Sequence, residues 1–190
     1  MRPIAVVPAA GAAERFGSEK LLAPVGDVPM IERTIRSLLE GGAKRAVVVV
    51  APGADELRRV LERIEHVSVE VNRARERGML SSIQAGLRDA PGDPIVVLPG
   101  DMPYVEPATV AALLQRHSEE GAIVSPRFRG KRGHPVVIPG RLRDEILSAT
   151  DDETLHDVLR RHSGERVDLD VADKGVVRDV DVPTDLEPAP

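Results

Sequence analysis

The sequence IAVVPAAGAAERFGSEK, residues 4–20, decides the fold. It begins with a short β-branched run, Ile4-Ala5-Val6-Val7, and continues into a loop of small residues that contains Gly11 and Gly17. A short apolar run that opens into a small-residue loop is typical of a strand in a parallel α/β sheet. Because such sheets bind ligands beyond the carboxyl ends of their strands, this loop is a candidate ligand site.

The rest of the chain repeats this alternation of short apolar runs and longer segments with helical spacing. That pattern predicts a three-layer α/β/α domain with a mostly parallel, Rossmann-like sheet, and we expect residues 1–190 to form one domain. Further strands are expected at 46–51, 67–71, 94–98, 122–125 and 135–138, and helices at 30–39, 57–64, 80–88, 108–117, 142–147 and 155–161. The tail, residues 176–183, alternates apolar and acidic positions and is interpreted as an edge strand.

Composition excludes several functional classes. The chain has 26 Lys+Arg, 31 Asp+Glu, a formal charge of -5 and no cysteine, so disulfides, iron–sulfur clusters and thiol nucleophiles are excluded. With Trp 0, Tyr 1 and Phe 2 and this negative charge, nucleic acid is not an expected partner. Since we find neither a signal-peptide pattern nor an apolar run of about 20 residues, no membrane partner is expected and a cytoplasmic location is predicted.

The loop Pro8–Lys20 has the character of a phosphate-binding loop. Small residues let the backbone approach a ligand closely, and Arg15 and Lys20 supply positive charge to a polyphosphate. It is not a Walker A loop, because Gly11 and Gly17 are too far apart and Lys20 does not follow Gly17. The alternative is a Gly/Ala-rich turn with two solvated basic residues.

Two acidic elements are candidate metal ligands. Asp101 directly follows a predicted strand, where a carboxylate can hold Mg²⁺, although an Asx-turn residue is the alternative. Asp179 and Asp181 stand two apart and so share one face of the expected tail strand. Either a divalent cation neutralises this pair, or the two carboxylates form the solvated face of an edge strand.

Together these segments resemble the motifs of the MobA-like nucleotidyltransferases. Residues 8–20 are similar to the family signature LAAGxSxRMGxxK, and residues 100–103 to its GDMP turn. Residues 133–135 resemble its RGHP segment, and residues 179–185 its closing DIDTPED. The matches follow in order over nearly the whole chain, and residues 78–86 resemble the GLSSSLxxG segment of the molybdenum cofactor cytidylyltransferases.

This resemblance implies Mg²⁺-dependent transfer of a nucleoside monophosphate from an NTP to a small phosphorylated acceptor, with release of pyrophosphate. It favours CTP, because Ala10 resembles the pyrimidine-using members, and molybdopterin as acceptor. The implied catalytic residues are Arg15, Lys20 and Asp101. The implied nucleotide-binding residues are Pro8, Ala9, Ala10, Gly11, Arg15, Lys20, Gly78, Ser82 and Gly100. Asp101 with Asp181 or Asp179 would hold the metal, and Gly133, His134 and Pro135 would face the acceptor.

Several alternatives remain open at the level of sequence. The acceptor is a sugar phosphate or phospholactate in one alternative, and GTP replaces CTP as donor to molybdopterin in another. Residues 151–156, DDETLH, stand where the molybdopterin enzymes carry GDxGAR, so the sequence does not fix the acceptor. A nucleotide-binding regulatory module without catalysis is the alternative from another class. His134 has either a functional or a structural role, and a possible protein partner for cofactor delivery is unknown from the sequence.

Overall fold

The computed structural model describes residues 2–11, 20–88, 90–181 and 185, and its centre is one eight-stranded sheet. The strand order is β10-β7-β9-β6-β1-β4-β5, and β8 pairs with β7. The strands are β1 (Ile4–Ala9), β4 (Arg45–Val50), β5 (Val67–Val71), β6 (Ile95–Val97), β7 (Ile123–Phe128), β8 (Lys131–Arg132), β9 (Val136–Ile138) and β10 (Arg166–Asp170). A separate two-stranded sheet joins β2 (Pro24–Val25) to β3 (Val28–Pro29).

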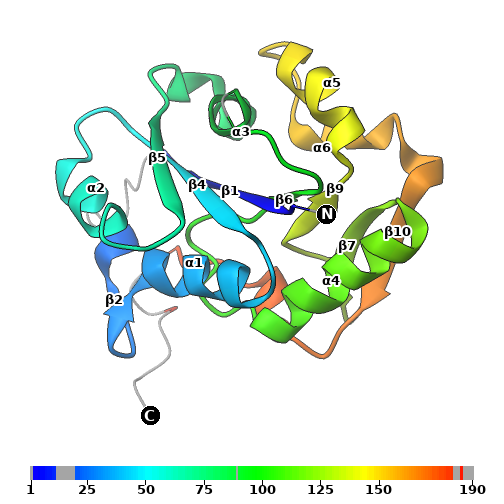
Figure 1. The fold of residues 1–190 in the computed structure, drawn as a ribbon, viewed down its shortest axis with the longest axis horizontal. Helices are drawn as coiled ribbons and strands as arrows, with labels where there is room; N and C mark the ends of the chain where they lie inside the picture. The colour runs from blue at the N-terminus through cyan, green and yellow to red at the C-terminus, as the bar shows by residue number, and fades with distance from the viewer. Residues whose placement is uncertain (1, 12–19, 89, 182–184, 186–190) are drawn as a thin grey trace.

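Helices cover both faces of the large sheet, which confirms the predicted three-layer architecture (Figure 1). On one face lie α1 (Met30–Glu40), α2 (Asp55–Leu61) and α4 (Pro107–Glu120), and on the other α3 (Met79–Leu87), α5 (Arg143–Ser148) and α6 (Leu155–Arg160). Each helix buries an apolar stripe against the strands. None of the helices in the described segments has the length and apolarity that a membrane span requires.

β9 is the one antiparallel strand in the order β10-β7-β9-β6-β1-β4-β5. Its direction determines which residues reach the edge of the sheet where ligands bind. β1 pairs in parallel with β4 and β6, so the residues that follow β1 and β6 emerge at the same edge. β9 runs antiparallel to β6 and pairs Val136 with Val97. The residues that precede β9, including Gly133 and His134, therefore lie at the carboxyl edge of the parallel strands.

The edge strand predicted at residues 176–183 is wrong over its described part, residues 176–181, and residues 182–183 lie outside the described residues. Lys174–Val177 forms a 3₁₀ turn, and residues 178–181 belong to no strand. The strand next to β7 is instead β10, which sequence patterning did not identify because its sequence, RVDLD, is mostly polar. Ion pairs between Arg127 and Asp170 and between Arg132 and Asp168 join β7, β8 and β10, so acidic and basic side chains stabilise this edge.

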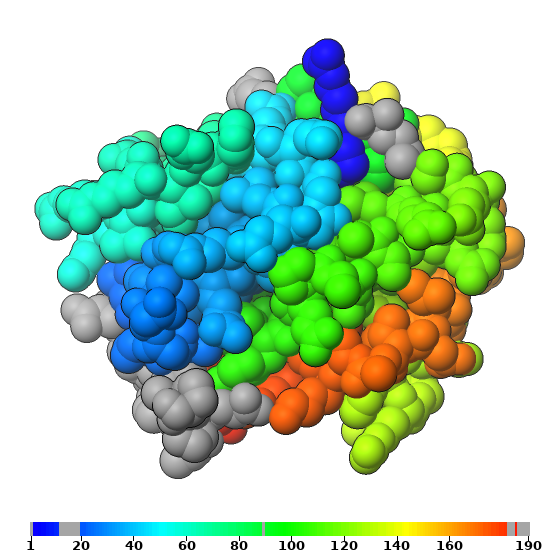
Figure 2. All heavy atoms as spheres, turned by 60° about the horizontal axis from the view of Figure 1, so that its bottom comes forward, coloured from blue at the N-terminus to red at the C-terminus, as the bar shows by residue number. Residues whose placement is uncertain are grey.

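The 3₁₀ turn is held against α4 and the preceding loop. One carboxylate oxygen of the buried Asp173 accepts hydrogen bonds from the Glu106 amide at 2.9 Å and the Thr109 hydroxyl at 2.8 Å. Figure 2 shows this side of the molecule, where the orange segment lies along the green segment that contains α4. Through these contacts the tail returns to the edge of the sheet, where the Val180 amide donates to the Asp101 carbonyl.

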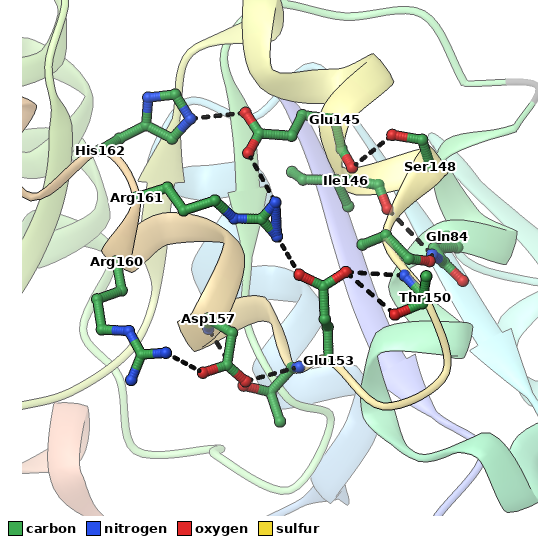
Figure 3. A network of polar contacts seen from close by, with 12 residues as sticks. Gln84, Glu145, Ile146, Ser148, Thr150, Glu153, Asp157, Arg160, Arg161 and His162 are labelled. Carbon is green, nitrogen blue, oxygen red and sulfur yellow. Dashed lines mark hydrogen bonds and ion pairs between the residues drawn. The ribbon is translucent and has the colours of Figure 1, made fainter.

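An ion-pair network fixes α5 and α6 to each other (Figure 3). The guanidinium of Arg161 lies between the carboxylates of Glu145 and Glu153. His162 contacts Glu145 at 2.6 Å. Beneath them, the Gln84 amide donates to the carbonyls at the end of α5. This network holds residues 150–155 in place above α3.

We expect His162 to make the stability of the fold depend on pH. Its hydrogen bond to Glu145 raises the pKa of His162 above the usual value, and partial burial lowers it by less. A raised folded-state pKa stabilises the fold below the ordinary pKa of about 6.5, and this contribution is lost as the pH rises through the folded-state pKa. The Tm advantage of the wild type over His162→Gln should therefore shrink from acidic to alkaline pH. An advantage that is constant over that range, or equal to that of the exposed control His66→Gln, would contradict this account.

Candidate active site

The loops after β1 and β6 enclose a pocket of about 360 Å³. Its position at the carboxyl edge of the sheet is the one that the sequence pattern predicts. The pocket is lined by Pro8, Ala9, Ala10, Gly11, Lys20, Leu21, Arg75, Gly78, Met79, Ser82, Pro99, Asp101 and Asp181. The small residues and exposed backbone of this lining, together with Lys20 and Arg75, are suited to a polyanionic ligand. We call this cavity the first pocket.

A lysine between two carboxylates forms the charged wall of the first pocket. Lys20 Nζ lies 2.9 Å from Asp101 Oδ2 and 3.2 Å from Asp181 Oδ1. Burial alone would lower the pKa of Lys20, but the hydrogen bonds and charges of the two carboxylates outweigh it and raise that pKa, so Lys20 is positively charged. Three chain segments that are far apart in the sequence thus place one positive and two negative groups at one point.

These two carboxylates fit a magnesium ion. Their oxygens already converge on one positive group, the Lys20 ammonium. Mg²⁺ in nucleotide sites usually takes one or two protein carboxylates and completes its shell with water and substrate phosphates. Within the described residues there is no group of three or more His, Cys, Asp or Glu side chains that could hold a metal ion, so any magnesium ion here would have at most these two carboxylates.

Other predicted residues lie elsewhere or outside the described residues. Asp179 is exposed and does not line the first pocket, so the structure brings Asp181 rather than Asp179 next to Asp101. Gly100 lies behind the pocket, where its amide donates to the Pro8 carbonyl and an added Cβ would meet Ile31 at 2.8 Å. Arg15 lies outside the described residues.

Sequence reasoning missed Asn72, which positions Ser82 at the first pocket. The buried Asn72 amide donates to Ser81 Oγ at 2.8 Å and to Ser82 Oγ at 3.0 Å. Its carbonyl oxygen accepts the Ala74 amide at 2.9 Å. The residue directly follows β5, and a polar side chain at a strand end was the signal available in the sequence.

Asn72→Ala is expected to lower the free energy of unfolding by about 1–3 kcal/mol, because it leaves buried hydroxyl and amide groups without partners. It should also weaken nucleotide binding, since Ser82 loses the donor that fixes it. Asn72→Asp is the matched control, because it keeps the acceptor for Ala74 and loses both donated bonds. Urea unfolding and nucleotide titration of both variants measure these effects. Unchanged stability in Asn72→Ala would rule out this positioning role.

A second pocket of about 590 Å³ adjoins the first and shares Gly78 and Met79 with it. Gly133 and His134 line it, as do residues 151–156, whereas Pro135 is buried and lines neither pocket. Leu80, Ile83, Val97, Val136, Leu155 and Leu159 give it an apolar part, and Arg77, Ser125, Arg132 and Arg166 add polar groups. Two ligands bound in the two pockets would meet near the start of α3.

His134 enters the second pocket from the segment before β9. Burial lowers the pKa of His134 below its usual value, more than a hydrogen bond to the Val97 backbone and the charges of Asp101 and Asp179 raise it. The imidazole is therefore neutral near pH 7. Gly133 precedes it at a point where an added Cβ would lie 1.9 Å from the Val176 carbonyl oxygen, so only glycine fits.

Comparisons with known proteins identify a family for the chain. The family model described as "MobA-like NTP transferase domain" matches residues 5–167. The bifunctional protein GlmU of Cereibacter sphaeroides is 32% identical over 159 residues, which are 78% of this chain and 35% of that protein. The chain thus spans about a third of the length of this relative.

Two further proteins match over most of both chains. The nicotine blue oxidoreductase of Paenarthrobacter nicotinovorans is 31% identical over 188 residues, covering 93% of this chain and 90% of that one. A solved structure of a nucleotidyl transferase from Methanothermobacter thermautotroptrophicus superposes with a TM-score of 0.79 at 24% identity, over 97% of this chain and 94% of that chain. That structural likeness concerns the fold.

Proposed function

Because the chain belongs to the MobA-like NTP transferase family, we propose that it transfers a nucleoside monophosphate from an NTP to a small phosphorylated acceptor and releases pyrophosphate. One observation carries the proposal: Lys20 lies between Asp101 and Asp181 in a pocket formed by the loops after β1 and β6. Phosphoryl-type transfer needs positioning and positive charge rather than a protein nucleophile.

In this proposal the NTP occupies the first pocket. The backbone of Ala9–Gly11 approaches the phosphates, and the ammonium of Lys20 neutralises charge on them. Gly78 and Ser82, which also line this pocket, contact the nucleoside. Asp101 and Asp181 would hold Mg²⁺, which supplies further positive charge to the triphosphate when bound. Arg15 remains a proposed phosphate ligand on the resemblance of its loop.

The acceptor would occupy the second pocket, with its phosphate directed toward Gly78 and Met79, where the two pockets join. An oxygen of that phosphate attacks the α-phosphorus, and the bond from phosphorus to the bridging β-phosphate oxygen breaks. That oxygen leaves with the electron pair as pyrophosphate. Neutral His134 donates to the Val97 backbone, so its free Nδ1 accepts a hydrogen bond from a hydroxyl or N–H group of the acceptor.

CTP and molybdopterin are the specific substrates that we propose. Ala10 supports a pyrimidine, since its likeness is to the pyrimidine-using members, and residues 78–86 support the likeness to the molybdenum cofactor cytidylyltransferases. Incubation with each NTP, Mg²⁺ and molybdopterin, followed by measurement of pyrophosphate, tests the assignment. Release with CTP alone among the NTPs is the expected result, and no release with CTP would contradict the specific form. Release only with a sugar phosphate or phospholactate would transfer the assignment to that acceptor.

A reductase is the second candidate, since a relative that matches over 90% of its own length is named nicotine blue oxidoreductase. Consumption of NADH or NADPH in the presence of a redox dye separates the two activities. Under the transferase proposal this consumption is absent, while CTP with Mg²⁺ raises the Tm. For a site saturated at about 100 times Kd, stabilisation by about 2.7 kcal/mol is expected.

A further inference from the structure

The second pocket collects buried polar atoms that lack partners. Four buried side-chain atoms in the described part of the chain have no hydrogen-bond partner: Arg77 Nε, Ser125 Oγ, His134 Nδ1 and Arg166 Nε. All four residues line the second pocket. Buried polar atoms in folded proteins are nearly always paired, because each unpaired one is costly. Their convergence on one cavity indicates that a bound molecule supplies the missing partners.

Ser125 is the clearest member of this set, because a polar side chain is unexpected at its buried position in the sheet. The register pairs Asp168 with Ser125 and Val97 with Val136, and the pairing of Val124 with Val137 sets Ser125 beside Val136. Ser125 thus joins a row of residues that faces α3 and α6. It is 2% exposed and its hydroxyl is unpaired, although its neighbour Val136 belongs to the apolar core of this face.

Arg166 lies on the same face, two residues before Asp168 on β10. Among the described residues it forms no ion pair, whereas the neighbouring Arg132 is 2.6 Å from Asp168. Burial, together with the charge of Arg132, lowers the pKa of Arg166 below its usual value. Asp168 also lies 3.9 Å from Arg127, so this one carboxylate pairs with two other arginines and forms no ion pair with Arg166.

We propose that the acceptor carries an apolar body and a second oxyanion, a carboxylate or a phosphate, which pairs with Arg166 and accepts a hydrogen bond from Ser125. The apolar body lies on Leu80, Ile83, Val136 and Leu159. A planar guanidinium binds either oxyanion with two parallel hydrogen bonds. This inference rests on the proposed transfer to a phosphorylated acceptor, because it specifies the class of acceptor that enters the second pocket. It does not rest on molybdopterin, which carries a single phosphate and no carboxylate, so its success would favour another acceptor.

Small probes test the inference without nucleotide. Calorimetric titration of the whole protein with phenylpropionate, phenylethyl phosphate and phenylpropanol compares two oxyanions with a neutral molecule of similar shape. At least one anion should bind roughly tenfold more tightly than the alcohol, as expected for a charge-assisted pair. The tighter of the two anions identifies the preferred oxyanion. If the alcohol binds as well as both anions, or no probe binds, the inference is wrong.

Single substitutions test whether Arg166 and Ser125 are responsible for anion binding. Arg166→Gln should abolish the preference for the anion while the Tm stays equal or rises, because the guanidinium has no ion pair to lose. Arg141→Gln is the matched control, since Arg141 pairs with Glu165 and does not line the second pocket. Ser125→Ala, which leaves the charge unchanged, should weaken anion binding severalfold. If Arg166→Gln prefers the anion over the alcohol as strongly as the wild type does, or if Ser125→Ala binds the anion as tightly as the wild type, the inference is overturned.

These outcomes are separable from the proposed function. If CTP-dependent pyrophosphate release occurs but Arg166→Gln leaves the KM for the acceptor unchanged, the transferase stands and the oxyanion site fails. If the probes bind as expected but no NTP supports release, the oxyanion site stands and the transferase fails.

Discussion

Asp101→Asn is expected to lower kcat for pyrophosphate release by at least about 100-fold, the effect typical of removing one preorganised charge from such a site. The substitution keeps the shape of the side chain but removes the carboxylate that lies 2.9 Å from Lys20 Nζ. A magnesium ion bound there would lose one of its two protein carboxylates. Since the Asp101 side chain is partly exposed, stability should change little.

Two aspartates of the tail, Asp181 and Asp179, provide a matched comparison for this prediction. Asp181→Asn should reduce kcat strongly, because Asp181 shares Lys20 with Asp101, whereas Asp179→Asn should reduce it by less than about threefold. Steady-state kinetics at saturating CTP and Mg²⁺ measure all three variants. If Asp101→Asn keeps more than a third of the wild-type kcat, or Asp179→Asn is the more damaging tail variant, the assigned metal ligands are wrong.

Gly133→Ala is expected to damage both stability and activity. The new Cβ would lie 1.9 Å from the Val176 carbonyl oxygen, a backbone atom that cannot move aside like a side chain. That carbonyl also accepts the His134 amide, so the clash separates the segment before β9 from the tail that carries Asp181. Overpacking of this kind costs about 1–3 kcal/mol.

The control for Gly133→Ala is Gly164→Ala, where an added Cβ meets nothing within 4 Å. Urea unfolding should show the loss of stability in the first variant only. Pyrophosphate release should fall in parallel, through a higher KM for the acceptor because His134 is displaced. Equal stability of the two variants would show that the tail does not pack on Gly133 as described.

Much of the fold was predictable because local apolar runs determine it. Strands such as β4, RAVVVV, are buried along nearly their whole length, and a continuous apolar run in the sequence shows this directly. β10 was not predictable in the same way, because its sequence is mostly polar: it pairs with β7 along the sheet and forms ion pairs with β7 and β8, and it has no continuous apolar run. At residues 178–181 a strand was predicted that does not form. Burial alternates there as it does in an edge strand, but these residues pair with no strand.

The candidate site was predictable where residues act through loops next to strand ends. Lys20 and Asp101 were identified in this way, and the structure brings them together. Asn72 was missed although it directly follows β5 and its partners Ser81 and Ser82 are only nine and ten residues further along the chain. Arg166 was missed because its role depends on the second pocket, which brings together segments far apart in the sequence. The choice between Asp181 and Asp179 likewise needed the folded tail, where only Asp181 reaches Lys20.

A crystal structure of the protein with a nonhydrolysable CTP analogue and Mn²⁺ tests the central claim most directly. The account predicts an anomalous peak between Asp101 and Asp181, with the triphosphate along Pro8–Gly11 and the Lys20 ammonium moved onto its oxygens. A triphosphate bound in the second pocket, or a metal ion held away from both carboxylates, would contradict it.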